Sequence, residues 1–317
     1  MSRADWPPTV GVDLGGTNLR LALVTNDGTI QADVREPTPV DFPHTIDAIV
    51  RLIRSFSGAP CAAVGVGAAG LVDGEGTIHY APNLPMMRHA PLGRDLAAAV
   101  GVPVVVDNDA NAAAWGEACH GAARGCRHAL MVTLGTGVGG GIIADGRVYR
   151  GAHGFAGEIG HWQYDPAGER CACGERGHWE AVASGTALGR LARARVLAGE
   201  AQSVLARAGG DPDAVSGHHV GESATAGESD GVALVAEYAR DVAVGLVALA
   251  NILDPELIVI SGGLVALGEV LLDPLRDAFA HHLEGAQYRP EVPIVAAELG
   301  MHAGVVGAAA MARDLIA

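Results

Sequence analysis

The sequence predicts an α/β protein built from two domains, and three observations support this prediction. Apolar strand segments alternate with helical segments along all 317 residues, a length that suits two domains. Residues 9–25 predict a strand, a glycine turn and a second strand, and residues 129–146 repeat that order. Because the same unit occurs once in each half, we expect an internal duplication with a cleft between the halves.

The first of these strand pairs places an acidic residue beside a glycine turn. Asp13 would end the first strand and face the backbone N–H groups of Gly15, Gly16 and Thr17. Such a turn can bind a phosphate, and an adjacent carboxylate can hold Mg²⁺ through water. A plain hairpin would also need these glycines. The second turn, which contains Thr136, favours phosphate binding, because two such turns could hold a polyphosphate through backbone dipoles, hydroxyls and Mg²⁺.

Polar side chains follow the buried strand predicted over residues 102–106. Asp107, Asn108 and Asp109 come directly after that strand, and Asn111 follows within the next predicted helix, residues 110–119. Ligands of open α/β folds bind outside the carboxyl ends of strands, so these side chains are candidates for a binding site. A helix N-cap is the alternative, but a cap needs only one such residue.

A short glycine-rich segment, residues 154–180, carries the pattern of a metal site. Cys171, Cys173 and His178 lie in one tight loop, and His161 precedes them. Two thiolates and two imidazoles are a donor set for tetrahedral structural Zn²⁺. Ordinary buried cysteines with scattered histidines are the alternative. Carboxylates at 158 and 180 bracket the loop, and structural zinc does not need them, so we expect the loop to brace a binding site.

The remaining elements complete the alternation. A buried strand over residues 257–260 runs into Ser261, Gly262 and Gly263, a third turn that suits a phosphate or nucleoside. A helix predicted over residues 264–283 would be interrupted near Pro274. The other predicted helices cover residues 44–57, 92–100, 183–197, 231–251 and 304–317. Residues 198–230 give only a weak signal, for helix fragments and loops.

Composition excludes several classes of protein. The net charge of −15 disfavours nucleic acid and anionic membranes as partners. All 21 basic residues are arginine, so a P-loop lysine, a protein-kinase strand lysine and a lysine Schiff base are impossible. No apolar run is long enough to cross a bilayer, and the first ten residues show no secretory leader, so we expect a cytoplasmic protein.

Taken together, these motifs resemble the ROK group of sugar kinases and repressors, within the actin- and hexokinase-like ATPase fold (ribonuclease H-like). The resemblance covers nearly the whole chain. Residues 13–20 resemble the first phosphate motif of the family, residues 108–112 its catalytic segment, and residues 134–137 its second phosphate motif. Residues 157–161 and 171–174 resemble its sugar and zinc signature, and residues 261–263 resemble its adenosine motif.

The resemblance implies transfer of the γ-phosphoryl group of ATP to the 6-hydroxyl of a hexose, with glucose as the first candidate. N-acetylmannosamine, N-acetylglucosamine and fructose kinases share the signature and remain open. Asp109 would accept the proton of the hydroxyl. The implied sugar-binding residues are Asn83, Asn108, Asp109, Glu158, His161 and Glu180. The implied ATP and Mg²⁺ residues are Asp13, Gly15, Gly16, Thr17, Asn18, Thr136, Gly137, Gly262 and Gly263. The implied zinc ligands are His161, Cys171, Cys173 and His178.

The resemblance also sets expectations for domains and partners. We expect a smaller domain of residues 1–117 plus 303–317, a larger one of residues 118–302, and a homodimer or homotetramer. The fourth metal ligand is His178, where the family usually has cysteine. The segment 85–91 lacks an aromatic residue found in many relatives near Asn83. A sugar-sensing repressor is disfavoured, because Asp13 leaves no room for a DNA-binding helix-turn-helix before it. Polyphosphate is disfavoured as donor, because it would need a basic track.

Overall fold

The computed structural model describes residues 7–56 and 61–317. Its contacts divide the chain into two compact units. Unit 1 comprises Met1–Leu130, Gly141–Gly157 and Glu298–Ala317, and unit 2 comprises Met131–Gly140 and Glu158–Ala297. The domain boundaries expected at 117/118 and 302/303, and the cleft expected between the halves, stay predictions.

A mixed sheet with strand order β3-β2-β1-β4-β7 forms the centre of unit 1. The alternating apolar residues of the first hairpin anchor this sheet in the core, where Val10, Val12 and Leu14 are all fully buried. β1, β4 and β7 run parallel, so their carboxyl ends meet at one edge, with Leu14 paired to Ala68 and Ala68 to Asn108. The strands are β1 (Thr9–Leu14), β2 (Asn18–Val24), β3 (Ile30–Pro37), β4 (Val64–Ala68) and β7 (Val104–Asn108), with a separate hairpin β5 (Leu71–Val72) and β6 (Ile78–Tyr80).

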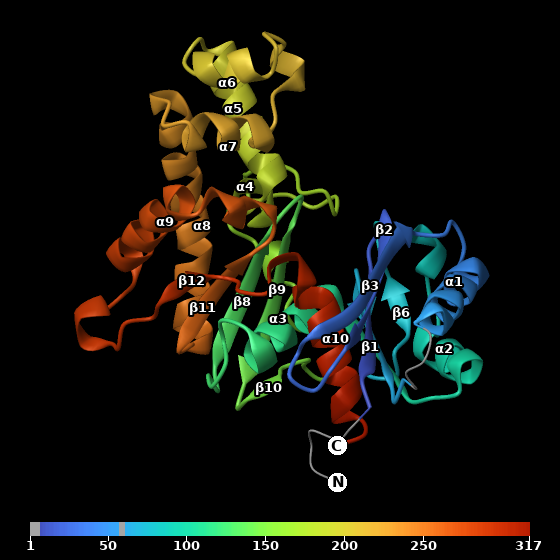
Figure 1. Ribbon diagram of the computed structural model, residues 1–317. Helices are drawn as coiled ribbons and strands as arrows, with labels where there is room; N and C mark the ends of the chain where they lie inside the picture. Colours follow the sequence, from blue (N-terminus) through green and yellow to red (C-terminus); the bar gives the residue numbers. More distant parts are fainter. Residues whose placement is uncertain (1–6, 57–60) are drawn as a thin grey trace. The chain divides into compact units, whose positions relative to one another are not determined.

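Helices cover both faces of this sheet (Figure 1). α1 and α2 pack on one face, where Ile49 and Leu96 join the main apolar core. α10 lies against the other face so closely that a Cβ atom at Gly11 of β1 would be 1.7 Å from the carbonyl oxygen of Val305. The helical elements of unit 1 are α1 (Phe42–Ser55), η2 (Pro85–Met87), α2 (Leu92–Val100), α3 (Asp109–His120), η7 (Gly300–His302) and α10 (Ala303–Asp314).

The predicted duplication is visible in a second sheet with the order β10-β9-β8-β11-β12. In both sheets the second strand in sequence lies beside the first, and the two later strands continue on the first strand's other side. The strands are β8 (Ala129–Leu134), β9 (Val138–Ala144), β10 (Arg147–Val148), β11 (Leu257–Ser261) and β12 (Ile294–Ala296).

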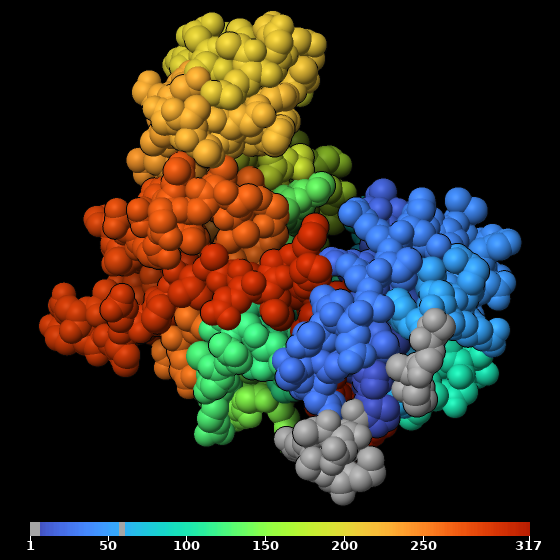
Figure 2. Space-filling model, viewed as in Figure 1, coloured from blue at the N-terminus to red at the C-terminus, as the bar shows by residue number. Residues whose placement is uncertain are grey.

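Unit 2 contains the remaining helices, grouped around the long α8. In the space-filling view the residues of α6 and α7, coloured yellow to light orange, pack as one block (Figure 2). The helices are η3 (Ile159–His161), α4 (Glu180–Ala183), α5 (Gly185–Leu197), α6 (Gln202–Arg207), η4 (Pro212–Ala214), α7 (Gly217–Thr225), α8 (Ser229–Leu253), η5 (Gly263–Leu267), α9 (Glu269–His282) and η6 (Ala286–Tyr288).

The helices predicted over residues 264–283 and 44–57 differ in their outcome. The predicted interruption at Pro274 is wrong, because α9 continues through that residue. The break lies instead at Gly268, between η5 and α9, where a φ of 57° and a ψ of −136° need glycine. The predicted helix over residues 44–57 is α1, and its last residue, Ser57, lies outside the described residues. Within the described part of the chain, no helix combines the length and apolar character needed to span a bilayer.

Candidate functional site

The first glycine turn lies at the carboxyl edge of the unit 1 sheet. The turn closes with the N–H of Gly15 donating to the carbonyl oxygen of Asn18 at 3.0 Å. Thr38, just after β3, holds this turn in place through two hydrogen bonds. The Thr38 hydroxyl donates to the carbonyl oxygen of Gly15 at 2.6 Å, and the Thr38 N–H donates to the carbonyl oxygen of Thr17 at 3.0 Å. Gly16 and Thr17 are exposed. The turn is therefore held firmly while part of it stays open to a ligand.

Asn83 lies directly against this turn. A Cβ atom at Gly16 would be 2.5 Å from the carbonyl oxygen of Asn83, so only glycine fits there. Asn83 itself is exposed. The structure thus brings the predicted sugar-binding asparagine next to the predicted phosphate turn, although 66 positions of sequence separate Asn83 from Thr17.

Asn108 and Asp109 connect β7 to α3 at the same edge. The Asn108 side chain caps α3, because its Oδ1 accepts the N–H groups of Ala110 at 2.8 Å and Asn111 at 3.2 Å. Its Nδ2 donates to the Gly70 carbonyl oxygen at 3.1 Å, which leaves the other Nδ2 hydrogen for a ligand. The helix N-cap that the sequence offered as an alternative is therefore present, and one N–H of the Asn108 amide can still donate to a ligand. Asp109 is half-buried in the first turn of α3, and its Oδ1 accepts the Ala110 N–H at 2.9 Å.

The two acidic groups at this edge are held in an environment that disfavours their charge. Burial and the nearby Asp109 carboxylate raise the pKa of Asp13 from 3.8 to about 6, and Arg20 and Arg35 offset part of that rise. Burial also raises the pKa of Asp109, against the effect of its backbone hydrogen bond. Carboxylates that repel each other at the edge of a phosphate turn are suited to a hard divalent cation with oxygen ligands such as Mg²⁺.

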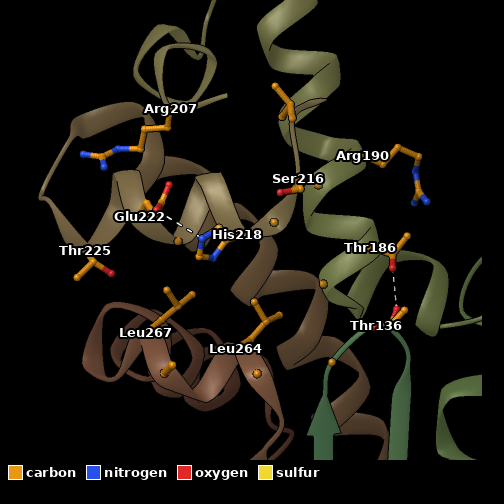
Figure 3. A pocket seen from close by; sticks show the side chains of 18 of the residues that line it. Thr136, Thr186, Arg190, Arg207, Ser216, His218, Glu222, Thr225, Leu264 and Leu267 are labelled. Carbon is orange, nitrogen blue, oxygen red and sulfur yellow. Dashed lines mark hydrogen bonds and ion pairs between the residues drawn. The ribbon is translucent and has the colours of Figure 1, made fainter. Parts of the chain in front are cut away.

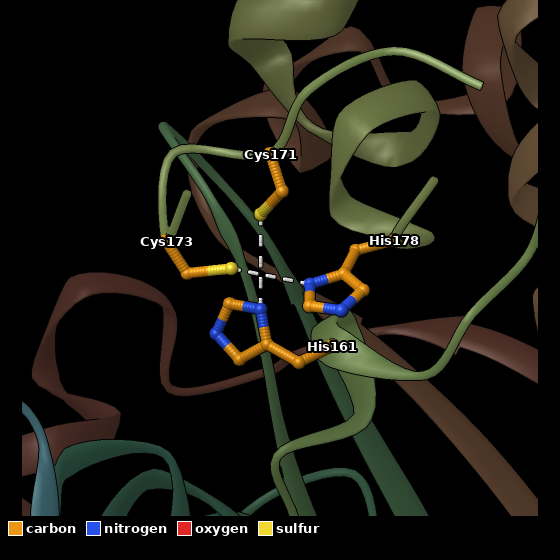
Figure 4. Close-up of side chains that lie close together, drawn as sticks. All are labelled: His161, Cys171, Cys173 and His178. Atoms are coloured by element: carbon orange, nitrogen blue, oxygen red, sulfur yellow. Dashed lines mark hydrogen bonds between the residues drawn. The ribbon is translucent and has the colours of Figure 1, made fainter. Parts of the chain in front are cut away.

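In unit 2 the four predicted metal ligands converge (Figure 4). Cys171 Sγ lies 3.8 Å from Nδ1 of His161, and Cys173 Sγ lies 3.2 Å from Nδ1 of His178. One donor atom from each residue lies within 4.8 Å of all the others. Tetrahedral zinc sets its ligand atoms roughly 3.3–3.8 Å apart, so the donor set and its spacing fit zinc after a small contraction.

The two carboxylates that bracket the metal cluster have different surroundings. Glu158 Oε2 lies 3.8 Å from Nε2 of His161, so the other ring nitrogen of that histidine faces the cluster. Glu180 accepts the N–H of Val138 through Oε2 at 3.0 Å and the thiol of Cys171 through Oε1 at 3.1 Å. Glu180 therefore connects the metal loop to the strand after Gly137, in addition to the sugar contact expected for it.

A cavity of about 1250 Å³ opens beside the second glycine turn in unit 2. Figure 3 shows Leu264 and Leu267 on one wall, with His218 and Glu222 of α7 facing them and Thr136 at one end. Of the predicted nucleotide residues, Thr136 and Gly263 line the cavity. Gly262 adjoins it with a φ of 89°, where a Cβ atom would be 2.4 Å from the Leu134 carbonyl oxygen.

Sequence reasoning missed the walls that come from α5 and α7. Residues of these helices line the cavity because α5 starts at the second turn, where the Gly185 N–H donates to the Gly135 carbonyl oxygen at 2.7 Å. Thr186 adds a hydroxyl bond to the Thr136 carbonyl oxygen at 2.8 Å. The weak pattern of residues 198–230 carried no signal that could have assigned α7 to this wall.

The three arginines of the cavity wall have partners of two kinds. Arg190 donates to the Ala181 carbonyl oxygen, and Arg193 donates to that of Asp213 at 2.7 Å. Arg207 forms a two-bond ion pair with Glu228, at 3.1 and 3.0 Å. Glu228 therefore balances the charge of Arg207, whereas the carbonyl oxygens hold Arg190 and Arg193 in place without neutralising them.

Comparison with known proteins agrees with this geometry. A model of the ROK family matches residues 9–315. The chain is 42% identical over 310 residues to a glucokinase of Streptomyces coelicolor, covering 96% of this chain and 98% of that protein. It is 34% identical over 312 residues to a glucokinase of Thermotoga maritima, covering 97% and 98%. A crystal structure of a ROK family glucokinase from Streptomyces griseus in complex with glucose and AMPPNP matches with a TM-score of 0.86 at 42% identity, covering 97% of this chain and 99% of that one. The chain therefore has an actin- and hexokinase-like α/β fold and belongs to the ROK family.

Proposed function

We propose that the protein is a glucokinase, which transfers the γ-phosphoryl group of ATP to the 6-hydroxyl of glucose. The observation that carries the proposal is a full-length match to family members named glucokinases, one of them solved with glucose and an ATP analogue. The candidate residues agree chemically, because carboxylates, an amide and an imidazole suit a ring of sugar hydroxyls.

In unit 1, Asp109 is proposed as the general base for the 6-hydroxyl. Burial raises the pKa of Asp109, and a carboxylate with a raised pKa is a stronger base than an ordinary aspartate. Asp13 would hold the magnesium of MgATP through water, and the exposed turn at Gly16 and Thr17 would face the phosphates. Phosphoryl transfer depends mostly on positioning and charge neutralisation, which these groups can provide without lysine.

In unit 2, the cavity beside Thr136 is proposed to hold the adenosine part of ATP. Leu264 and Leu267 offer an apolar wall to the base, and Glu222 and His218 offer polar atoms to its edge. Inorganic polyphosphate would instead need free cations along the cavity. Arg207 is ion-paired with Glu228, and a full-length relative was solved with an ATP analogue, so ATP is the better donor.

The metal cluster is proposed to hold structural zinc through His161, Cys171, Cys173 and His178. The bound ion would order the loop that carries Glu158 and Glu180, which we propose as ligands of the sugar hydroxyls. A thiolate on the metal has no proton to donate, so Glu180 Oε1 would be released from its bond to Cys171 and become available to a hydroxyl.

A coupled assay of ADP release tests the proposal. We expect glucose to give a kcat/KM at least tenfold above those of mannose, fructose, N-acetylglucosamine and N-acetylmannosamine. With glucose fixed and glucose 6-phosphate measured directly, ATP should exceed polyphosphate as donor. A preference for N-acetylmannosamine would assign the alternative kinase activity of the family. No phosphorylation of any sugar in the panel would refute the kinase proposal.

A further inference from the structure

Asp107 is a buried carboxylate directly before Asn108 and Asp109, and the proposed reaction gives it no role. Its side chain is only 4% exposed. Oδ1 accepts two bonds, from the backbone N–H of Asn108 at 2.7 Å and from Nδ2 of Asn111 at 2.9 Å. Oδ2 accepts the Nε–H of Arg150 at 2.5 Å. All of these residues belong to unit 1.

These bonds fix the backbone on both sides of Asp109. Asp107 holds the residue before Asp109 through its N–H, and it holds Asn111, two residues after Asp109, through its side chain. The Asn108 side chain adds the cap on α3. Within the described part of the chain, the side-chain hydrogen bond of Asp109 is a local one, accepted from the N–H of Ala110 at 2.9 Å. Its position therefore depends on its neighbours, and Asp107 is the carboxylate that connects them.

Arg150 fixes which carboxylate oxygen of Asp107 faces the donors of Asn108 and Asn111. Its Nε–H occupies Oδ2, so Oδ1 is left to face the Asn108 and Asn111 donors. Without the guanidinium, the bond that holds Oδ2 would be lost, and the carboxylate could rotate away from the Asn108 and Asn111 donors. Arg150 is 41% exposed, so its replacement does not open a hole in the core.

We propose that Asp107 and Arg150 are positioning residues for the base, and that Arg150 affects turnover through Asp107. Neither residue is expected to touch substrate. The inference rests on the proposed function, in which Asp109 is the base. It adds a connection between the turn that carries Asp109 and the segment after β10 that leads towards Glu158.

The chain offers a matched control for Arg150. Arg147 and Arg150 both line a second cavity, of about 650 Å³, which Asp107 also lines. Arg147 is exposed, and no hydrogen bond or ion pair of Asp107 within the described residues involves it. Arg150→Gln and Arg147→Gln therefore remove the same charge from the same region. They differ in whether Asp107 loses a partner.

We expect Arg150→Gln to lower kcat on the order of 10- to 100-fold, because a displacement of the base by about 1 Å can cost 10²-fold. The KM for ATP should stay within about twofold, and Arg147→Gln should stay within about twofold of wild type in kcat. Asp107→Asn should resemble Arg150→Gln, and the double variant should be no slower than the slower single one, because both act through one contact. Arg150→Lys, which keeps the charge, should recover part of the lost turnover.

Hydrogen exchange of the unliganded protein gives a readout that needs no activity. Amides of residues 108–111 should exchange faster in Arg150→Gln than in Arg147→Gln, while the remaining amides of α3 keep their rates. Equal exchange and equal kcat in the two variants would overturn the inference, as would a lower melting temperature with unchanged kcat in Arg150→Gln. If wild type phosphorylates no sugar, the proposed function fails while the exchange comparison still tests the pair. If Asp107→Asn does not fold, the two arginine variants decide.

Discussion

Replacing Asp13 with asparagine should make the protein more stable, and the gain should depend on pH. The pKa of Asp13 rises from 3.8 to about 6 on folding, so the folded protein binds this proton more tightly than the unfolded chain. Stability is therefore lost as pH rises from about 4 to about 6, and the whole loss is present above that range. A rise of about two pKa units corresponds to about 3 kcal/mol.

Asparagine cannot ionise, so Asp13→Asn removes this loss. We expect the free energy of unfolding to increase by about 3 kcal/mol at most at pH 8, and by about half of that at pH 5, where Asp13 is still protonated in the folded state. Urea denaturation followed by circular dichroism at both pH values measures the two differences. Sugar phosphorylation should fall in the same variant, since Asp13 is proposed to hold magnesium.

Asp27 provides a control of opposite sign. Bonds donated by Thr25 and Thr29 lower the pKa of Asp27 to about 2, so its ionised form stabilises the folded state at every pH above about 4. Asp27→Asn should therefore reduce stability, and by the same amount at pH 5 and pH 8. The reasoning fails if Asp13→Asn is no more stable than wild type at pH 8, or if its gain is equal at the two pH values.

Three further predictions concern the proposed reaction. Asp109→Asn should lower kcat by roughly 10²–10⁴-fold while the glucose dissociation constant, measured by calorimetry, changes less than threefold; near-normal turnover would remove Asp109 from the role of base. Treatment with a chelator should raise the KM for glucose, lower the melting temperature and change the fluorescence of the buried Trp179 next to the proposed zinc ligand His178; an unchanged KM would separate the metal from the sugar site. Gly137→Ala would place Cβ 2.4 Å from Glu180 Oε2, so the KM for glucose should rise at least tenfold, whereas Gly74→Ala, with no atom within 4 Å, should leave it unchanged.

Sequence patterns were sufficient where neighbours in sequence are neighbours in space. The apolar alternation around the two glycine turns predicted the β1–β2 and β8–β9 hairpins, and the spacing of Cys171, Cys173 and His178 predicted their convergence. The position of residues 107–109 directly after a buried strand predicted a binding site at the carboxyl end of that strand, and β7 does end at Asn108.

Contacts between distant segments were not predictable in the same way. Thr38 braces the first turn from 23 positions away, and Arg150 reaches Asp107 across 43 positions. Neither residue belongs to a motif whose spacing could reveal it. The break before α9 was assigned to proline, since proline removes a helical hydrogen bond, but the positive φ at Gly268 ended the preceding helix first.

Because the chain has no lysine, the negative charge of ATP has to be neutralised by other groups. Four negative charges on ATP must be neutralised, yet the net charge of the protein is −15 and Arg207 of the unit 2 cavity is already ion-paired with Glu228. Backbone N–H groups contribute only partial charges, so a divalent cation would supply about half of the compensation. The same argument explains why Asp13 and Asp109 can lie near one another at an energetic cost to the folded protein. A pair of carboxylates that repel each other in the free enzyme is stabilised when the cation arrives, so the loss of stability becomes selectivity for MgATP over ATP alone.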